Sequence, residues 1–277
     1  MKIELQGLTL RYGDRYALQD LIVSLEGQII GLLGANASGK TSLLQILAGT
    51  SAATEGQAFI DGMPLRPGRR PGISYLPQES PAFPFWQNPK ETLSATFLLR
   101  GVTGYDPHDL LAGLGLEDED RRADEFSGGM KQKVRIAQAL AHAPTLLIMD
   151  EPTTGLDIRE RFRLLRLIER LRSRVSIVFS THQPADAASV CDQVLILRRG
   201  RAVASGKPAS ITAAVNDRVF EWVVPATTLP ADPAYEICEA ERSNGTLRLR
   251  AVGDRPPGGV AVPPRLEDAY VWLTRDT

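Results

Sequence analysis

The chain has 277 residues, 43% of them hydrophobic and 23% charged, and its formal net charge at pH 7 is −1. This length predicts one domain with a smaller addition in a globular protein of ordinary composition, and the near-zero charge gives no electrostatic argument for a nucleic-acid partner. No apolar run approaches the roughly 20 residues that span a bilayer, and the amino-terminus lacks the apolar core of a secretion signal, so we expect a cytoplasmic protein.

The first part of the chain favours strands, with a single helix among them. Alternating apolar and polar residues predict the first strand, and an all-apolar run predicts a buried strand before the glycine-rich segment 34–41. Turns are expected at Gly13-Asp14, Glu26-Gly27 and Asp61-Gly62. The predicted strands span 2–12, 21–25, 28–33, 57–60 and 73–76, and the predicted helix spans 42–48.

Between residues 77 and 143 the predicted elements are helices. Asn88 and Asp106 each precede a proline, which is a common start of a helix. Met130, Val134 and Ala137 recur at helical spacing, and the charged stretch 117–125 is most simply a solvated loop. The predicted helices span 88–99, 108–112 and 127–141.

Strands and helices alternate after Pro144, which indicates a parallel sheet covered on both faces. Around residue 217 the pattern changes to strands broken by Pro and Gly, followed by one short helix. The predicted strands span 146–149, 175–179, 194–197, 219–224, 235–240 and 246–252, and the predicted helices span 159–171, 184–191 and 266–273.

Cysteine and histidine carry no site of their own in this sequence. Cys191 and Cys238 are too few for a disulfide framework, and each is expected to be a small buried apolar side chain. His108, His142 and His182 have no Cys or His near them at the spacing of metal ligands. The candidate binding and catalytic residues therefore lie in the glycine-rich segment 34–41 and around the acidic pair Asp150–Glu151.

The segment from Gly34 to Thr41 fits G-x-x-x-x-G-K-[ST], a loop that wraps nucleotide phosphates. A buried strand before it and a helix after it make a chance glycine-rich turn a poor alternative, because backbone N–H groups and the helix dipole then converge on one anion. Lys40 is expected to reach the β- and γ-phosphates, and the Thr41 hydroxyl to ligate Mg²⁺. The expected nucleotide contacts in this segment are Gly34, Asn36, Ala37, Ser38, Gly39, Lys40, Thr41 and Ser42.

The apolar strand 146–149 ends in Asp150 and Glu151. Asp150 is expected to hold Mg²⁺ through water, and Glu151 to orient the attacking water or accept its proton. The alternative is a strand that ends by chance in two acids before Pro152. A buried strand seldom ends in two carboxylates unless a cation neutralises them, because burying an unpaired charge is costly.

Ser127, Gly128 and Gly129 form a turn that opens a helix and offers N–H groups and a hydroxyl to an anion. The chain therefore contains two helix N-termini suited to phosphate. Capping of the helix could by itself explain Ser127.

Taken in this order, the motifs resemble those of ATP-binding-cassette (ABC) ATPases over roughly residues 1–210. The resemblance implies that Tyr12 stacks on adenine, that Gln78 senses Mg²⁺ and a membrane partner, and that Asp157 lies in a dimer-contact loop. It also places His182 at the γ-phosphate. Taken singly, each of these residues except Asp157 is better explained by a structural role: Tyr12 as a strand aromatic, Gln78 as a loop amide and His182 as a polar cap at a strand end. Their occurrence together, in the order of the family motifs, favours the functional roles.

The resemblance implies an α/β fold: a P-loop NTPase (RecA-like) core with an antiparallel β subdomain and a helical signature subdomain at about 78–143. We accordingly expect a nucleotide-binding domain at 1–216 and a small C-terminal α+β appendage at 217–277. The family also implies a head-to-tail dimer with a second copy or a relative. Each ATP with its Mg²⁺ then lies between the Lys40 loop of one subunit and the Ser127 turn of the other.

The family further implies a separately encoded transmembrane permease that holds the chain at the inner face of the cell membrane. The aromatic segment 81–86, which follows Gln78, is predicted either to dock the permease or to pack in the helical subdomain. No nucleic acid is expected as a partner. The cargo is set by the permease and not by this chain.

Some residues depart from the family pattern. Ala37 stands where glycine is usual, and its methyl group is expected to restrict a backbone angle. Phe126 and Met130 in the signature, together with the 266–268 Leu-Glu-Asp segment, resemble exporters of drugs and antimicrobial peptides. The expectation is therefore an exporter ATPase, with Glu151, His182 and Gln78 as catalytic residues and Thr41, Gln78 and Asp150 at the metal.

Other functions remain open at this point. One is the ATPase of an importer, and another is an ABC ATPase that acts on ribosomes or DNA without transport. A single cassette and a short segment between Lys40 and Asp150 argue against the latter class, whose members carry two cassettes or an inserted coiled coil. A regulatory module that binds ATP without hydrolysing it is disfavoured by Glu151 and His182.

Overall fold

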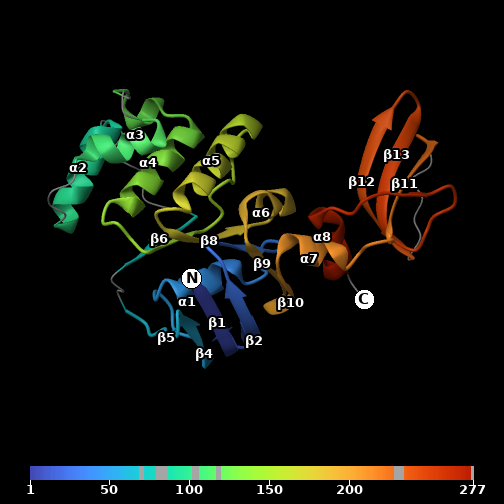
Figure 1. Ribbon diagram of the computed structural model, residues 1–277, viewed down its shortest axis with the longest axis horizontal. Coiled ribbons are helices and arrows are strands. Elements are labelled where there is room, and N and C mark those ends of the chain that lie inside the picture. The colour runs from blue at the N-terminus through green and yellow to red at the C-terminus, as the bar shows by residue number, and fades with distance from the viewer. Residues whose placement is uncertain (69–71, 79–86, 102–105, 117–119, 228–233, 276–277) are drawn as a thin grey trace.

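The computed structural model describes residues 1–68, 72–78, 87–101, 106–116, 120–227 and 234–275 (Figure 1). A six-stranded sheet lies at the centre, with an antiparallel sheet below it, helices above it, and a smaller sheet at the carboxyl-terminal end. This arrangement agrees with the α/β core, antiparallel subdomain and helical subdomain expected from the sequence.

The first sheet is antiparallel, with strand order β2-β1-β4-β5. Buried residues alternate with less buried ones at the start of β1 and the end of β2, as period-two alternation predicts for a half-covered sheet, and register shifts near Leu8 and Leu10 break the alternation. Its buried face, which includes Ile3 and Leu5, packs with the central sheet and with helix α1 in one core cluster. The elements are β1 (Lys2–Tyr12), β2 (Arg15–Glu26), β4 (Glu55–Ile60), β5 (Met63–Pro64) and α1 (Lys40–Leu47).

The central sheet has strand order β10-β9-β3-β8-β7-β6, and its pairs are parallel except for β10 against β9. All residues of β3 and β7 are buried, because both faces of this sheet are covered. Alternate residues of β3 enter two different cores: Ile30 and Leu32 face α1, while Ile29 and Leu33 face the cluster with the other helices. The strands are β3 (Ile29–Leu33), β6 (Ile73–Leu76), β7 (Leu146–Met149), β8 (Ser176–Thr181), β9 (Gln193–Arg198) and β10 (Arg201–Gly206).

Polar caps fix the starts of the helices. Asn88 forms a reciprocal capping box with Glu91, and Asp106 accepts a hydrogen bond from the backbone of His108. Leu164, Leu165 and Ile168 form the buried face of the arginine-rich helix α5. The helices are α2 (Pro89–Arg100), α3 (Pro107–Leu114), α4 (Gly128–Leu140), α5 (Ile158–Leu171) and α6 (Pro184–Val190), and Ala123–Glu125 forms a 3₁₀ turn.

In the described part of the chain, four helices or strands have no counterpart among the predicted ones: the two-residue strands β5 and β14 (Val260–Ala261), strand β10 and helix α7 (Pro208–Ala213). Strand β10 is an edge strand of small and polar residues, so its sequence lacks the apolar alternation that predicts strands. A tight turn at Arg199 and Gly200, both at positive φ, directs the chain back along β9.

The carboxyl-terminal sheet has strand order β12-β13-β11-β14 and a small core of its own around Trp222, Tyr235 and Leu249. The last helix, α8, returns to the main body beside α6 and α7, where Leu266 and Ala269 join the large core cluster (Figure 1). A division at residue 217 stays a prediction. The elements are β11 (Val219–Pro225), β12 (Tyr235–Ser243), β13 (Thr246–Gly253), β14 (Val260–Ala261) and α8 (Leu266–Thr274).

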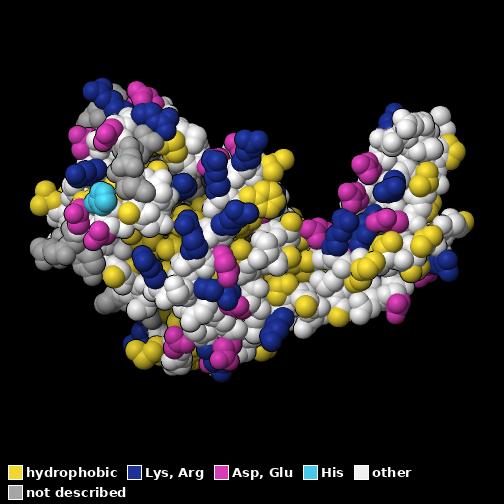
Figure 2. Space-filling model, turned by 45° about the horizontal axis from the view of Figure 1, so that its top comes forward, with side chains coloured by type: hydrophobic (Ala, Val, Ile, Leu, Met, Phe, Trp, Pro, Cys, Tyr) yellow, Lys and Arg dark blue, Asp and Glu magenta, His cyan; other side chains and the backbone are white. Residues whose placement is uncertain are grey.

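The carboxyl-terminal sheet projects from the main body, and Figure 2 shows a hollow between the two. On this face Lys and Arg side chains are interspersed with Asp and Glu, which agrees with the near-zero net charge. Hydrophobic side chains gather where the carboxyl-terminal part meets the body.

Candidate functional site

The candidate site lies at the edge of the central sheet where its parallel strands end. Strand β8 pairs with β3 on one side and with β7 on the other, so the residues that follow these three strands meet. They are the glycine-rich loop after Leu33, the Asp150–Glu151 pair after Met149, and His182 after Thr181. Ligands of open α/β sheets bind at this edge.

Hydrogen bonds and close backbone contacts hold the loop in place. The Gly34 N–H donates to the Thr181 carbonyl (3.3 Å), and the Gly200 N–H donates to the Ser38 carbonyl (2.9 Å). A side chain at Gly34 would place Cβ 2.4 Å from the Ser38 hydroxyl, and Gly39 has φ +107° with Ala17 O 2.6 Å from an added Cβ. Only glycine fits these two positions.

The Lys40 ammonium is buried and fully engaged. Its Nζ donates to the carbonyls of Gly34 (2.8 Å) and Ala35 (3.0 Å) and forms an ion pair with Glu151 Oε1 at 3.2 Å. The side chain is only 5% exposed. Glu151 therefore neutralises a charge that lies inside the glycine-rich loop.

Glu151 links the lysine to the histidine that follows β8. Its Oε2 lies 2.7 Å from His182 Nδ1 and also accepts a hydrogen bond from the Thr154 hydroxyl at 2.7 Å. Burial by itself raises the pKa of the Glu151 carboxyl, but the Thr154 and His182 hydrogen bonds and the Lys40 charge outweigh it, so this pKa lies below its ordinary value. Glu151 is consequently a carboxylate, the form that can act as a base.

The Asp150 side chain is held by Ser180 and not by Lys40 or His182, the two ionic partners of Glu151. Its Oδ1 accepts a hydrogen bond from the Ser180 hydroxyl at 2.5 Å, and that same oxygen of Ser180 accepts the Glu151 N–H at 2.8 Å. Ser180 thus fixes both acids of the pair. Burial, with the Asp150 charge as a smaller cause, raises the pKa of the nearby Tyr75 to about 12.

A cavity of about 440 Å³ opens over the loop and brings together many of the predicted nucleotide contacts. Arg15, Tyr16 and Ala17 also line it, and sequence reasoning missed all three. The only available signal was their position just past the turn that follows Tyr12. The predicted residues in the lining are Tyr12, Asn36, Ala37, Gly39, Lys40, Thr41, Ser42, Gln78 and Glu151.

The residues present fit a nucleotide phosphate. The Ser38 hydroxyl oxygen is buried and has no hydrogen-bond partner, although buried polar atoms are normally paired. It lies in the same loop as the Lys40 ammonium and the start of α1. An unpaired hydroxyl, a buried cation and a helix N-terminus are the donor set that an anion requires.

The Ser127 turn does not reach this cavity. Ser127 and Gly128 are exposed and absent from the lining, and an added Cβ at Gly128 would meet Leu156 and Gly155. The Ser127 hydroxyl accepts the Met130 N–H at 3.2 Å, so it does cap α4. Asp157 likewise caps α5, where it accepts the Glu160 N–H at 2.9 Å.

Gln78 is exposed at the rim of the cavity. Its carbonyl and that of Pro77 accept hydrogen bonds from Arg135 of α4 at 3.2 and 2.7 Å, which ties the rim to the helical subdomain. The aromatic segment 81–86 lies outside the described residues. Both interpretations of that segment therefore stay predictions.

Ala37 adopts the left-handed conformation, with φ +61°, as expected from the glycine that is usual there. This conformation costs a residue with Cβ about 1–2 kcal/mol relative to glycine, and the flexibility of glycine in the unfolded chain offsets part of that. We expect Ala37→Gly to raise the free energy of unfolding by about 0.5–1 kcal/mol in urea titrations. A decrease would show that the methyl group contributes packing that outweighs its strain.

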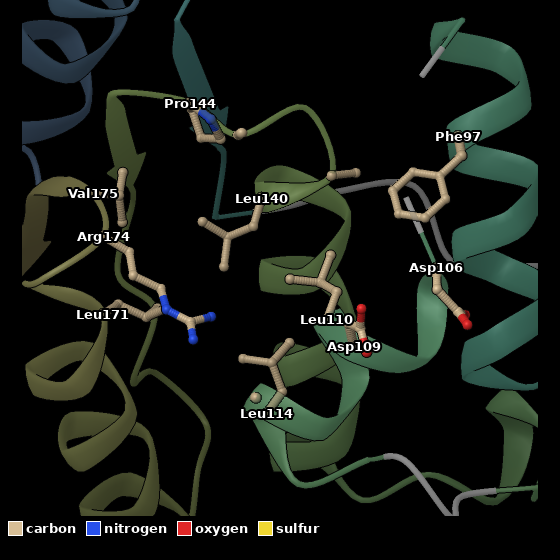
Figure 3. Close-up of a pocket in the computed structure, with 13 residues that line it drawn as sticks. Phe97, Asp106, Asp109, Leu110, Leu114, Leu140, Pro144, Leu171, Arg174 and Val175 are labelled. Atoms are coloured by element: carbon tan, nitrogen blue, oxygen red, sulfur yellow. The ribbon is translucent and has the colours of Figure 1, made fainter. Parts of the chain in front are cut away.

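A second cavity, of about 530 Å³, lies between α3 and the end of α5 (Figure 3). Leu110, Leu114 and Leu140 point into it, and Arg174 enters from the side of α5. Pro144 and Val175 in its wall precede strands β7 and β8, so it lies at the opposite edge of the sheet from the loop. It contains none of the residues predicted for nucleotide.

Comparison with known proteins gives the following similarities. The profile of the family described as "ABC transporter" matches residues 19–154. An uncharacterized ABC transporter ATP-binding protein, YxlF of Bacillus subtilis, is 37% identical over 70% of this chain and 67% of its own. The spermidine/putrescine import ATP-binding protein PotA of Rubrobacter xylanophilus is 31% identical over 94% of this chain and 73% of its own length. The Nod factor export ATP-binding protein I of Burkholderia orbicola is 31% identical over 98% of this chain and 96% of its own length. Further relatives carry the names of import proteins for Fe(3+) ions and molybdenum.

Solved structures show the same fold. The dimeric post-hydrolysis state of the ATP-binding cassette MJ0796 bound to ADP and Pi superposes with a TM-score of 0.63. It covers 74% of this chain and 98% of its own at 23% identity. In the described part of this chain, every helix is too short or too polar to cross a bilayer.

Proposed function

The chain belongs to the ABC transporter family as an ATPase subunit, and from this premise we propose that it drives transport through an ATP-dependent dimer. The observation that carries the proposal is the separation of two anion sites in one chain. The cavity over the Lys40 loop lacks the exposed turn at Ser127 and Gly128. A second subunit that supplies this turn would complete the site.

Within one subunit the roles follow from the contacts described above. The phosphates would take the positions around Lys40 and Ser38, and Tyr12 would cover the base at the open side of the cavity. Thr41, Gln78 and Asp150 would hold Mg²⁺, which when bound neutralises charge on the phosphates.

ATP would compete with Glu151 for Lys40, since the ion pair at 3.2 Å occupies the ammonium that the phosphates need. Once released from the lysine, the Glu151 carboxylate can orient water and accept its proton. His182, 2.7 Å from that carboxylate, can hold it and contact the γ-phosphate. The closing of two subunits on ATP would then be the motion that a membrane permease uses.

The direction of transport expected from the signature and the 266–268 segment is not supported. Relatives named for spermidine/putrescine, Fe(3+) and molybdenum import outnumber the Nod factor export proteins among those compared. We propose import as the direction. The chain would then act at the inner face of the membrane through its permease, and a substrate-binding protein retained with the tagged chain and its permease would support import.

A mixing experiment tests the composite site. Lys40→Ala removes the loop cation, and Ser127→Arg blocks the exposed turn of the other half-site; each variant alone should have no measurable ATPase activity. A mixture of the two contains dimers with one intact site, because Lys40 comes from one chain and Ser127 from the other. With random pairing, half of the dimers carry one of two sites, so we expect roughly a quarter of wild-type activity.

Binding of a fluorescent ATP analogue by the Ser127→Arg chain alone is the control, since its Lys40 loop is intact. An inactive mixture of two folded variants would contradict the shared site. Activity of Ser127→Arg by itself would show that the turn is not needed.

A further inference from the structure

One buried carboxylate beside the candidate site has no role in the mechanism described above. Asp186 lies in the first turn of α6, shortly after His182, and its side chain is fully buried at 0% exposure. A charge in such a position is costly unless it is paired and hydrogen-bonded. Asp186 does not line the cavity over the phosphate loop, so it does not act on the nucleotide directly. Its partners therefore decide what it does.

The two carboxylate oxygens of Asp186 contact different segments of the chain. Oδ1 accepts a hydrogen bond from Arg161 Nε of α5 at 2.6 Å. Oδ2 accepts from the Thr153 hydroxyl at 2.7 Å and from the Thr181 hydroxyl at 3.4 Å. Thr153 closely follows the acidic pair of the site, and Thr181 ends β8 directly before His182. One side chain therefore joins helix α5 to both segments that carry the proposed catalytic groups.

The segment after β7 needs such a contact. Glu151 adopts a left-handed conformation with φ +47°, which is strained for a residue with Cβ and persists only where the surroundings hold it. The Thr154 N–H donates to the Glu151 carbonyl at 3.2 Å and closes the turn. Between these two residues, the buried Thr153 hydroxyl ties the turn to Asp186. The position of the Glu151 carboxylate therefore depends on where Asp186 is held.

The segment after β8 is fixed in a similar way. The Thr181 hydroxyl accepts the Gln183 N–H at 3.0 Å, which spans the backbone on either side of His182. The Asp186 N–H donates to the Gln183 carbonyl at 3.1 Å. Side chain and backbone of Asp186 thus both contact the residues that flank the histidine.

The third partner of Asp186 lies near the surface where α5 begins. Arg161 is in the second half of the first turns of α5, which starts after Asp157. Ile158 and Phe162, one helical turn apart, are 74% and 60% exposed, so large apolar side chains are uncovered there. In the proposed dimer the loop that contains Asp157 meets the second subunit. The start of α5 is then the part of this network closest to that subunit.

We propose that Asp186 is a positioning residue that links dimer formation to hydrolysis: through Arg161 it joins the start of α5 to the segments that place Glu151 and His182. This inference rests on the proposed function and adds residues outside the motifs of the cassette. Contact of the second subunit with α5 would thereby set the position of the groups that act on water. Arg161, like Asp186, is absent from the lining of the nucleotide cavity, so the link affects turnover and not ATP affinity.

The test compares variants of the full chain that break the link with different effects on stability. Arg161→Met removes the cation and leaves the buried Asp186 carboxylate without its ionic partner. The double variant Arg161→Met, Asp186→Asn lacks the same link but buries no unpaired charge, so it should be more stable in urea than Arg161→Met.

The matched control is Arg172→Met, the same substitution at the carboxyl end of the same helix. Arg172 pairs with Asp192 at 2.9 Å. Asp192 accepts the N–H of Ile29 at the start of β3, so this pair lies at the opposite edge of the sheet from the phosphate loop. The measurements are phosphate release for kcat, titration with a fluorescent ATP analogue for Kd, and urea unfolding.

We expect kcat to fall roughly ten- to a hundred-fold in Arg161→Met and in the double variant, because small displacements of catalytic groups have effects of this size. Kd should stay at the wild-type value in both, and Arg172→Met should keep the wild-type kcat. Stability should recover in the double variant while kcat does not. That combination separates positioning from a loss of stability.

Recovery of kcat together with stability in the double variant would overturn the proposal, because the pair would then act on stability alone. An equal fall of kcat in Arg172→Met, or a change confined to Kd, would also overturn it. If Arg161→Met does not fold, the double variant decides by itself: wild-type kcat contradicts the link, and a reduced kcat with unchanged Kd supports it.

Failure of the proposed function gives a different result, since the wild-type chain itself then hydrolyses no ATP. Hydrogen exchange of the peptide covering 150–157, measured without nucleotide, still tests the link in that case. It should be faster than wild type in Arg161→Met and in the double variant, and unchanged in Arg172→Met. Equal exchange in all four proteins would show that Asp186 and Arg161 do not hold this segment.

Discussion

Glu151→Gln is expected to retain ATP binding, to tighten it, and to lower kcat by about 10²–10⁴-fold. Glutamine has nearly the shape of glutamate but cannot accept the proton of the attacking water. It also cannot form the 3.2 Å ion pair that occupies Lys40 in this structure, so the ammonium becomes available to phosphate. The two effects should appear together: slower turnover and a lower Kd.

The measurements are phosphate release for kcat, equilibrium titration with ATP for Kd, and gel filtration with and without ATP. The variant is expected to elute as a dimer when ATP is present, because the nucleotide stays in the site. Glu55→Gln, on the exposed start of β4, makes the same substitution away from the site and should match wild type. A variant that elutes only as a monomer with saturating ATP would falsify the dimer mechanism. Retained turnover would remove Glu151 from the catalytic role.

Asp268 of α8 forms a buried ion pair with Arg250 of β13. Asp268→Ala is expected to lower the free energy of unfolding by about 3 kcal/mol, the low end of the usual cost of breaking a buried pair, because Arg250 keeps its ion pair with Glu221. The Arg250 side chain is 5% exposed and Asp268 1%, so water cannot replace the lost carboxylate. The substitution also removes the group that accepts the Arg265 N–H. Urea unfolding, followed by circular dichroism, measures the change.

A surface pair in the same region provides the comparison. Arg265 and Glu239 lie 3.3 Å apart with both side chains more than half exposed, so Glu239→Ala should cost at most about 1 kcal/mol. The double variant Arg250→Met, Asp268→Leu should be more stable than Asp268→Ala alone, because it buries no unpaired charge. Equal losses from Asp268→Ala and Glu239→Ala would show that the buried pair does not anchor α8.

Local patterns were sufficient to place the motifs of the site on their elements. The run from Ile29 to Leu33 is apolar throughout, and the glycine-rich loop follows it at once, so the strand, the loop and the start of α1 could each be predicted from neighbouring residues. The same holds for the strand that ends in Asp150 and Glu151. Capping residues such as Asn88 marked the helix starts correctly, since a cap acts on the backbone two or three residues away.

Other parts of the site depended on contacts that no local pattern contains. Arg15 and Tyr16 enter the cavity because the turn before them folds β2 back along β1. Strand β10 was missed because its edge position, not its sequence, makes it a strand. The direction of transport was inferred from a few signature and tail residues, and such short segments carry too little information to separate subgroups.

By itself the sequence determined the chemistry available to this protein: a loop that binds phosphate, an acidic pair, and a second anion-binding turn, each within a few consecutive residues. The tertiary structure decided which of these groups meet. It placed Lys40, Glu151 and His182 in one network and left the Ser127 turn outside it. The physical reason is that local elements follow from short-range periodicity and caps, whereas pairings across the chain follow from the burial of apolar surface by the whole fold.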